Sequence, residues 1–190
     1  MGKPERGSLR LFVALWLPGP LSRAVSARLD ELRRGSRGVR WVRPDQLHLT
    51  LKFLGETPST ELPELTSALA GVAAETRPFH LSLAPGGVFP PNGPPRVVWL
   101  GLTPEEDLAA LAARVEEALA PLGHAPERRP FRAHLTLGRA EPGAVFDRGL
   151  LGRPLETGPV MVERVSLVQS VLRPQGAVYT TLREWPLARG

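Results

Sequence analysis

Cysteine is absent from this sequence of 190 residues. Its absence excludes a disulfide framework, a thiol nucleophile and a zinc site with cysteine ligands. The sequence also lacks an apolar run long enough to cross a membrane, and no apolar run of the signal-peptide type follows the charged first residues. We therefore expect a cytoplasmic protein that has no membrane partner.

Lysine is scarce as well, since only Lys3 and Lys52 occur and every other basic side chain apart from the histidines is an arginine. The formal net charge of +5 at pH 7 suits an acidic partner such as nucleic acid. The preference for arginine over lysine, together with abundant Ala, Gly, Pro and Leu, is also typical of a GC-rich genome. Charge alone therefore leaves RNA binding open.

A short motif, H-L-T-L, is present twice, at residues 48–51 and 134–137. Side chains at positions i and i+2 of a strand point to the same face. Each copy therefore places a histidine beside a threonine and sends both leucines to the opposite face, into a core. A histidine exchanges a proton near neutral pH, and a threonine hydroxyl can bind an anionic oxygen. Two copies facing each other would surround a small anion with His48, Thr50, His134 and Thr136.

The repetition extends beyond the tetrapeptides, because the same offset separates Arg10 from Arg96 and Pro18 from Pro104. Both stretches predict a strand followed by a helix, so strand, helix and motif strand recur with one spacing. We interpret residues 1–190 as a single domain of two pseudo-symmetric lobes. The predicted class is α+β, with two antiparallel sheets facing a central groove and the helices outside.

Hydrophobic periodicity predicts the remaining elements. Helical spacing occurs within residues 21–32, 62–73 and 108–119. Strands are predicted at residues 9–17, 39–42, 47–54, 79–83, 97–102, 131–139, 161–172 and 177–185, the last two joined by a hairpin turn at 173–176. Residues 85–95 are rich in Pro and Gly and predict a cleft rim without regular structure, while residues 141–159 predict a long loop. Thr103 to Glu106 has the form of a capping box with Pro at the first helical position.

The paired motifs and their surroundings resemble the 2H phosphoesterase superfamily. Within it, the chain resembles the RNA 2′,3′-cyclic phosphodiesterases, long called 2′-5′ RNA ligases. The resemblance covers almost the whole chain, with blocks at residues 10–14, 41–42, 47–55, 89–101, 131–139 and 170–179. One position departs from the family pattern, because Ala133 stands where a proline commonly precedes the second histidine. We expect this change to alter local stiffness rather than chemistry.

The resemblance implies hydrolysis of RNA 2′,3′-cyclic phosphate ends, such as those of tRNA fragments, to 2′-phosphomonoesters without a metal or other cofactor. It implies that His48 donates a proton to the 3′ oxygen and that His134 activates water. Thr50 and Thr136 would bind the non-bridging phosphate oxygens. Arg139 matches the family's Gly/Ala-Arg position and would face the phosphate. We expect the protein to be a monomer.

The sequence leaves other functions open. The same residues would serve the reverse reaction, which joins tRNA halves through a 2′-5′ bond, and a groove of this kind could also bind RNA without turnover. Metal-dependent hydrolysis is a third alternative, because Asp45 lies near His48, although no H-x-H or H-E-x-x-H cluster is present.

Two further histidines need an interpretation. His80 begins a sequence of the form H-x-S-x, but it lacks the duplicated flanks, so we expect a surface or edge-strand histidine. His124 lies between Gly and Pro residues in a predicted loop, so we expect it to be exposed to solvent.

Overall fold

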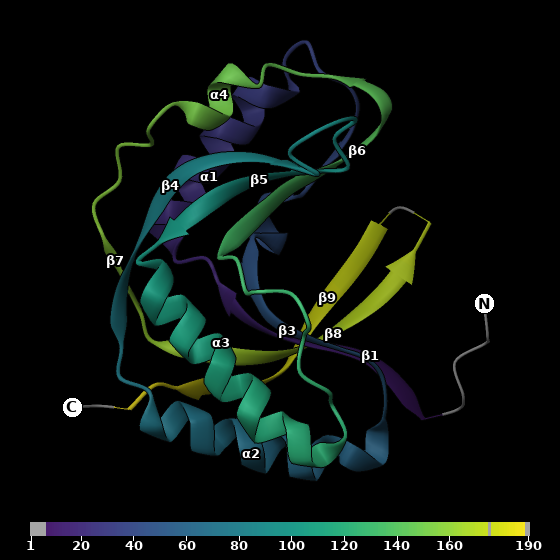
Figure 1. Ribbon diagram of the computed structural model, residues 1–190, viewed down its shortest axis with the longest axis vertical. Coiled ribbons are helices and arrows are strands. Elements are labelled where there is room, and N and C mark those ends of the chain that lie inside the picture. Colours follow the sequence, from purple (N-terminus) through teal and green to yellow (C-terminus); the bar gives the residue numbers. More distant parts are fainter. Residues whose placement is uncertain (1–6, 175, 189–190) are drawn as a thin grey trace.

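The structure is a computed structural model that describes residues 7–174 and 176–188. These residues form nine strands and four α-helices (Figure 1). The strands are β1 (Ser8–Trp16), β2 (Arg37–Trp41), β3 (His48–Pro58), β4 (Phe79–Phe89), β5 (Val97–Thr103), β6 (His134–Val145), β7 (Val160–Val162), β8 (Arg164–Arg173) and β9 (Gly176–Pro186). The helices are α1 (Gly19–Arg33), α2 (Leu62–Glu75), α3 (Glu105–Leu119) and α4 (Gly149–Gly152), and short 3-10 turns occur at Pro44–Gln46, Ser59–Glu61 and Ala120–Leu122.

The strands pair in the order β7-β4-β5-β6-β3-β1-β8-β9, and β2 pairs with β6 beside this path. All of these pairs are antiparallel. The β9-β8-β1-β3 half meets the β6-β5-β4-β7 half at one residue pair, Leu49 with Leu135. The α+β class with antiparallel strands is confirmed. The described residues form one hydrogen-bonded sheet in two halves, however, and not two separate sheets, because β3 and β6 remain paired where the halves meet.

Helices pack on both halves and enclose the core. Helix α2 packs against α3 and against β8 and β9, and α3 also contacts β3 and β5. Helix α1 packs against α4, which in turn contacts β4 (Figure 1). The predicted apolar faces of the three long helices are confirmed, since their leucine and valine side chains are buried at Leu21, Val25, Leu29, Leu32, Leu65, Leu69, Val72, Leu108, Leu111, Val115 and Leu119. Among the described residues, no helix has the length and apolar character needed to span a membrane.

Strand β4 continues through the glycine-rich stretch that the sequence predicts to be irregular. It runs to Phe89, paired with β5 through this stretch apart from one irregularity. A Cβ atom on Gly86 would overlap the carbonyl oxygen of Trp99 on β5. Glycine therefore permits a close approach of the two strands here instead of breaking the strand.

The start of α3 and the segment after the second motif also differ from the predictions. Pro104 occupies the N-cap position of α3, and no side chain caps the helix, so the predicted capping box is wrong. Strand β6 extends to Val145, well into the predicted loop 141–159, and the short helix α4 lies within the rest of that loop. The buried Arg28 of α1 donates hydrogen bonds to the carbonyl oxygens of Leu150 and Arg153 and so holds this helix in place. The β8–β9 hairpin is confirmed up to the Arg173–Gly176 pair, and residue 175 in its turn lies outside the described residues.

Candidate active site

The two H-L-T-L motifs lie on adjacent antiparallel strands, joined where the leucines at their second positions pair. Leu49 and Leu135 are at most 1% exposed and point into the core. Extending this register by one residue on either side places His48 opposite Thr136 and Thr50 opposite His134. Because side chains alternate along a strand, these four half-buried side chains share the face opposite to the leucines. The structure therefore brings both predicted pairs together.

The Leu49–Leu135 pair also sets the arrangement within this group. His48 and His134 are diagonal neighbours, as are Thr50 and Thr136. The four side chains therefore mark the corners of a space between the two strands, with the imidazoles at two opposite corners and the hydroxyl groups at the other two. This arrangement is suited to a tetrahedral anion.

Both imidazoles are oriented by the same backbone contact. The Nδ1 atom of His48 lies 2.7 Å from the carbonyl oxygen of Gln46, and Nδ1 of His134 lies 2.8 Å from that of Arg132. A carbonyl oxygen only accepts hydrogen bonds, so Nδ1 carries the proton in both rings. Each neutral imidazole then presents an unprotonated Nε2 and can accept a proton there, while each imidazolium can donate one from the same atom.

His48 is enclosed by aromatic side chains from β1 and β9. Its ring centroid lies 5.0 Å from that of Phe12, 5.5 Å from that of Trp16 and 5.2 Å from that of Tyr179. Burial among these rings lowers the pKa of His48, and the hydrogen bond to Gln46 offsets part of that effect. Without a bound anion, the neutral imidazole of His48 is therefore favoured.

His134 contacts a second aromatic group on the other half of the sheet. The Phe89 ring lies edge-on to it at 5.3 Å, and the Trp99 ring lies at 6.4 Å. Phe89 and Trp99 are themselves stacked at 5.0 Å. Aromatic rings thus hold each histidine of the pair from the side, while the hydrogen bond that orients each ring uses Nδ1 and not Nε2.

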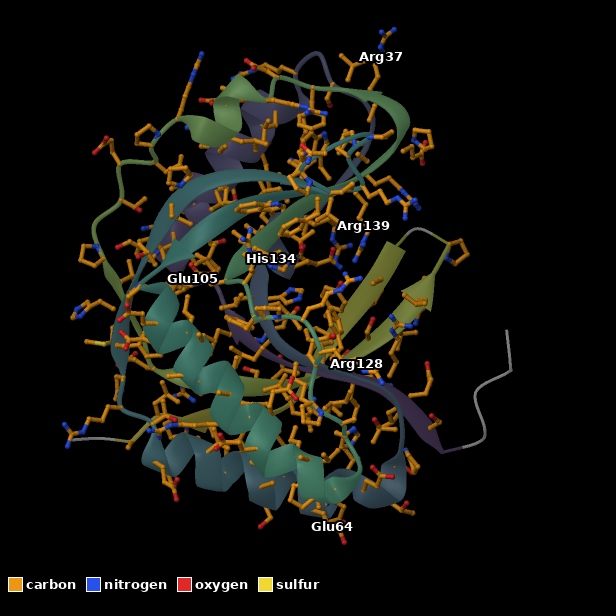
Figure 2. All side chains as sticks on the ribbon, in the orientation of Figure 1. Arg37, Glu64, Glu105, Arg128, His134 and Arg139 are labelled. Atoms are coloured by element: carbon orange, nitrogen blue, oxygen red, sulfur yellow. The ribbon has the colours of Figure 1, made fainter. Side chains whose placement is uncertain are left out.

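A groove of about 1540 Å³ opens over this face of the sheet. Thr50, His134, Thr136 and Arg139 line it, whereas His48 is set back among its aromatic neighbours. One wall comes from the stretch 89–97, so the predicted cleft rim 85–95 is confirmed only from Phe89 onward, and another wall comes from α3 and residues 125–132. Figure 2 shows His134, Arg139 and Arg128 around the same open region between α3 and the β8–β9 hairpin.

The charge along the groove is mainly positive. Its lining includes the arginines Arg96, Arg128, Arg129, Arg132 and Arg139. Within the described part of the chain, no carboxylate lies within 4.0 Å of these guanidinium groups. The lining lysine, Lys52, is instead paired with Glu116. The groove therefore offers several cations to an anionic ligand.

The remaining candidate residues lie elsewhere. His80 is exposed on β4 opposite Met161 and does not line the groove, as predicted. The prediction that His124 is exposed is wrong, because its side chain is only 12% exposed and its Nε2 lies 3.4 Å from a carboxylate oxygen of Glu61. Asp45 is engaged by Arg43 at 2.8 Å. Across residues 7–174 and 176–188, no group of three or more His, Cys, Asp or Glu side chains is placed to hold a metal ion.

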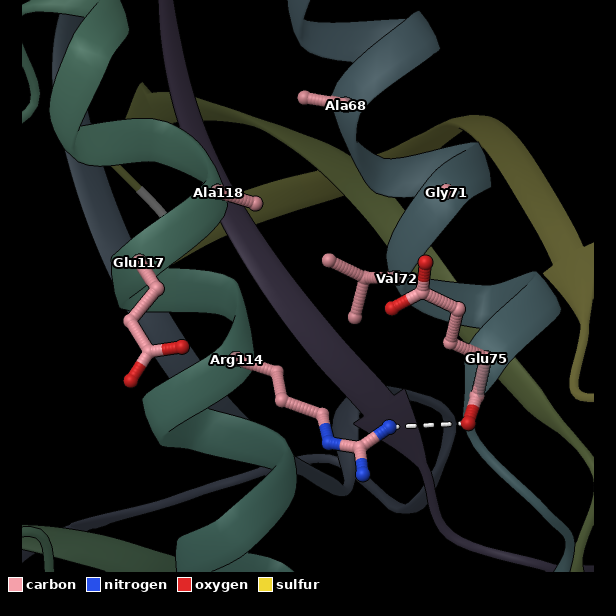
Figure 3. A pocket seen from close by; sticks show the side chains of 7 residues that line it. All are labelled: Ala68, Gly71, Val72, Glu75, Arg114, Glu117 and Ala118. Atoms are coloured by element: carbon pink, nitrogen blue, oxygen red, sulfur yellow. Dashed lines mark hydrogen bonds between the residues drawn. The ribbon is translucent and has the colours of Figure 1, made fainter.

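A second, smaller hollow lies between α2 and α3, away from the motifs (Figure 3). Its volume is about 360 Å³, and small side chains form much of its surface. Arg114 crosses it and donates a hydrogen bond of 2.8 Å to the carbonyl oxygen of Glu75. Neither motif contributes a side chain to it, so we assign it no role in the chemistry.

Known proteins match this chain over most of its length. The family model described as the 2′-5′ RNA ligase superfamily matches residues 21–172. A protein of Archaeoglobus fulgidus named RNA 2′,3′-cyclic phosphodiesterase is 38% identical over 177 residues, which are 92% of this chain and 98% of the relative. A protein of Thermus thermophilus with the same name is 39% identical, over 94% of this chain and 90% of the relative.

Solved structures share the whole fold. The crystal structure of a Thermus thermophilus protein superposes with a TM-score of 0.80 at 33% identity and covers 94% of this chain and 98% of that one. E. coli LigT in complex with 3′-AMP superposes with a TM-score of 0.74 at 27% identity and covers 96% of this chain and 99% of that one. LigT has also been crystallised with phosphate.

Proposed function

The chain belongs to the 2′-5′ RNA ligase superfamily, and we propose that it hydrolyses RNA 2′,3′-cyclic phosphate ends to 2′-phosphomonoesters by metal-independent acid/base catalysis. One observation carries the proposal. The Leu49–Leu135 pair puts His48 and His134 diagonally across two strands, and each ring binds a carbonyl oxygen through Nδ1, which leaves Nε2 for the chemistry. The relatives named RNA 2′,3′-cyclic phosphodiesterase support the choice of substrate.

The reaction needs one proton acceptor and one proton donor. Nε2 of neutral His134 takes a proton from water as the water oxygen attacks phosphorus. The bond from phosphorus to the 3′ oxygen breaks, and the protonated Nε2 of His48 gives its proton to that oxygen. The phosphate stays on the 2′ oxygen, and the two histidines exchange protonation states before the next turnover. Each proton transfer contributes roughly a hundred- to ten-thousand-fold in rate. The assignment of donor and acceptor rests on the family resemblance.

The other corners of the site would hold the phosphate. Thr50 and Thr136 lie on the other diagonal, one on each side of the line between the histidines, where their hydroxyls can donate to the two non-bridging oxygens. Arg139 lines the same groove from β6 and is exposed, so its guanidinium can reach an anion in the groove. We assign these three residues to binding and charge neutralisation rather than to proton transfer.

The lowered pKa of His48 is compatible with its role as the acid. Burial makes the imidazolium less stable and therefore a stronger proton donor once it forms. A bound phosphate monoanion beside the ring favours the protonated form. We therefore infer that substrate binding and protonation of His48 support each other.

The proposal is tested with an oligonucleotide that ends in a 2′,3′-cyclic phosphate, incubated with enzyme in EDTA. The products are compared with standards that carry a 2′-phosphate or a 3′-phosphate. We expect quantitative conversion to the 2′-phosphate, unaffected by chelation. Loss of activity in EDTA that one divalent ion restores would overturn the metal-independent mechanism, and a 3′-phosphate product would overturn the assignment of the leaving oxygen.

The joining of RNA ends is a second candidate, favoured by the name of the matching family, which describes RNA ligases. In it, a 5′-hydroxyl takes the place of water and a 2′-5′ bond forms. His48 and His134 would serve both reactions, because His134 would take the proton from the attacking 5′-hydroxyl instead of from water and His48 would still protonate the leaving 3′ oxygen. Incubating a cyclic-phosphate end with a large excess of a 5′-hydroxyl oligonucleotide tests it, and a product of summed length that resists 3′-5′-specific nucleases is the expected result.

We further propose that the fold consists of two pseudo-symmetric lobes. We also propose that the protein is a cytoplasmic monomer and that its substrates are RNA ends such as those of tRNA fragments. The strand order β5-β6-β3-β1 supports the lobes, since each motif strand pairs with the strand that precedes it in its own half. The absence of cysteine supports a reducing compartment. Sedimentation at micromolar concentration tests the monomer, and a dimer mass would contradict it.

A further inference from the structure

Lys52 is a buried cation that the proposed chemistry does not use. It follows the first motif on β3, and its side chain is 4% exposed. Its Nζ atom forms an ion pair with Glu116 on α3 and donates a hydrogen bond of 2.9 Å to the carbonyl oxygen of Ala125. A buried ammonium is retained only where partners satisfy it. One side chain therefore links the catalytic strand to α3 and to the segment beyond it.

That segment, residues 123–133, connects the end of the Ala120–Leu122 turn to β6 and contains no helix or strand. It lines the groove from Ala125 to Arg132 and carries Arg128 and Arg129. Its two ends are held by the two motif strands: Lys52 binds the carbonyl of Ala125, and Nδ1 of His134 binds that of Arg132. Between these anchors, Glu127 accepts hydrogen bonds from the backbone N–H groups of the two arginines, which shapes the tip of the segment.

We propose that Lys52 is a positioning residue that holds segment 123–133 along the groove, so that Arg128 and Arg129 contact backbone phosphates of the RNA chain that leads to the reacting end. This inference rests on the proposed function. Both guanidinium groups line the groove, and neither has a carboxylate within 4.0 Å among the described residues. A mononucleotide carries only the reacting phosphate. The two arginines should therefore matter for an oligonucleotide and not for a nucleoside 2′,3′-cyclic phosphate.

The test compares Lys52→Met with the wild type on an oligonucleotide and on a nucleoside 2′,3′-cyclic phosphate, at several salt concentrations. Without the anchor, KM for the oligonucleotide should rise by roughly 3- to 30-fold, since two exposed ion pairs no longer form. The slope of log KM against log salt concentration should fall by about 0.7 for each phosphate of the single strand that is no longer bound, which is about 1.4 for two. KM and kcat for the mononucleotide should change by less than about two-fold, because the His134 anchor remains.

Two comparisons separate positioning from general damage. The double substitution Arg128→Gln with Arg129→Gln should lower the salt slope by the same amount, and adding Lys52→Met to it should change the slope no further. Arg114→Met removes another long cation that binds a carbonyl oxygen, outside the groove, and should leave every value unchanged. If Lys52→Met does not fold, Glu116→Gln carries the test, because it removes the counter-charge from a partly exposed position and should shift the slope in the same direction.

A Lys52→Met enzyme with the wild-type salt slope, or a Glu116→Gln enzyme with that slope where the first variant does not fold, would overturn the proposal. Equal salt slopes for both substrates in the wild type would overturn it as well, while leaving the hydrolysis of cyclic phosphates intact. Failure of the wild type to hydrolyse the mononucleotide would instead count against the proposed function itself.

Discussion

Leu49 and Leu135 lie directly opposite each other, and this single pair joins the two halves of the sheet. Both side chains are buried in the core. Beyond the pair the strands take different partners, since β3 continues against β1 and β6 continues against β5 and β2. The relative position of the two motif histidines therefore depends on how these two leucines pack.

Truncating either leucine should destabilise the protein and misalign the site. Leu135→Ala should lower the free energy of unfolding by about 2–5 kcal/mol, because it removes a fully buried side chain and leaves a cavity. Denaturation with urea measures the decrease. Leu172→Ala is the matched control, since that leucine is 65% exposed on β8, and it should change the stability by no more than about 0.5 kcal/mol. Equal effects of the two substitutions would contradict a special role for the Leu49–Leu135 pair.

Replacing either motif histidine should remove most of the turnover and leave the fold intact. His48→Ala and His134→Ala should each reduce kcat by roughly a hundred- to ten-thousand-fold, since each removes one proton transfer. Circular dichroism and thermal melting check the fold. His80→Ala is the control, because His80 is exposed on β4 away from the groove. An inactive His80→Ala enzyme beside an active motif variant would refute the assignment of the site.

Stability should fall as the pH drops through the normal range of histidine, because burial lowers the pKa of His48 in the folded protein. The unfolded chain titrates near the ordinary value of 6.5 and so binds more protons than the folded chain just below it. The free energy of unfolding should therefore decrease below about pH 6.5, by at most about 1.4 kcal/mol per pH unit from this residue.

Urea titrations at several pH values measure this dependence in the wild type and in His48→Gln. The variant should lack the component that His48 contributes. Inorganic phosphate should weaken the dependence in the wild type, because a bound anion favours the protonated ring. A His48→Gln protein that loses stability with acid as steeply as the wild type would show that another group is responsible.

The parts of this structure that follow from local pattern could be predicted from the sequence. Alternation in the H-L-T-L motifs places His48 and Thr50 on one face of a strand, and helical spacing identifies the buried faces of α1 to α3. The duplicated spacing also indicates that the motifs face each other. The first two features depend on neighbours along the chain, which a single sequence shows directly, and the third depends on one pattern repeated at a fixed offset.

Features that depend on distant residues could not be predicted in the same way. Tyr179 packs on His48 from the last strand, and nothing in either local pattern signals that contact. Lys52 is notable in the sequence only because lysine is rare, and its burial depends on Glu116 and on the backbone at Ala125. Gly86 indicates a break in the strand, whereas it allows β4 to approach the Trp99 carbonyl. In each case a tertiary contact decides the outcome.

The assignment of His48 as the acid and of His134 as the base is tested most directly by changing the leaving group. A 2′,3′-cyclic substrate with sulfur in place of the 3′ oxygen expels a thiolate, which needs no proton. His48→Ala should hydrolyse this substrate at a rate close to that of the wild type, whereas His134→Ala should remain slow by roughly a hundred-fold or more, because water still needs a base. If this substrate restores the rate of His134→Ala instead, or restores the rate of neither variant, acid catalysis by His48 and base catalysis by His134 would be contradicted.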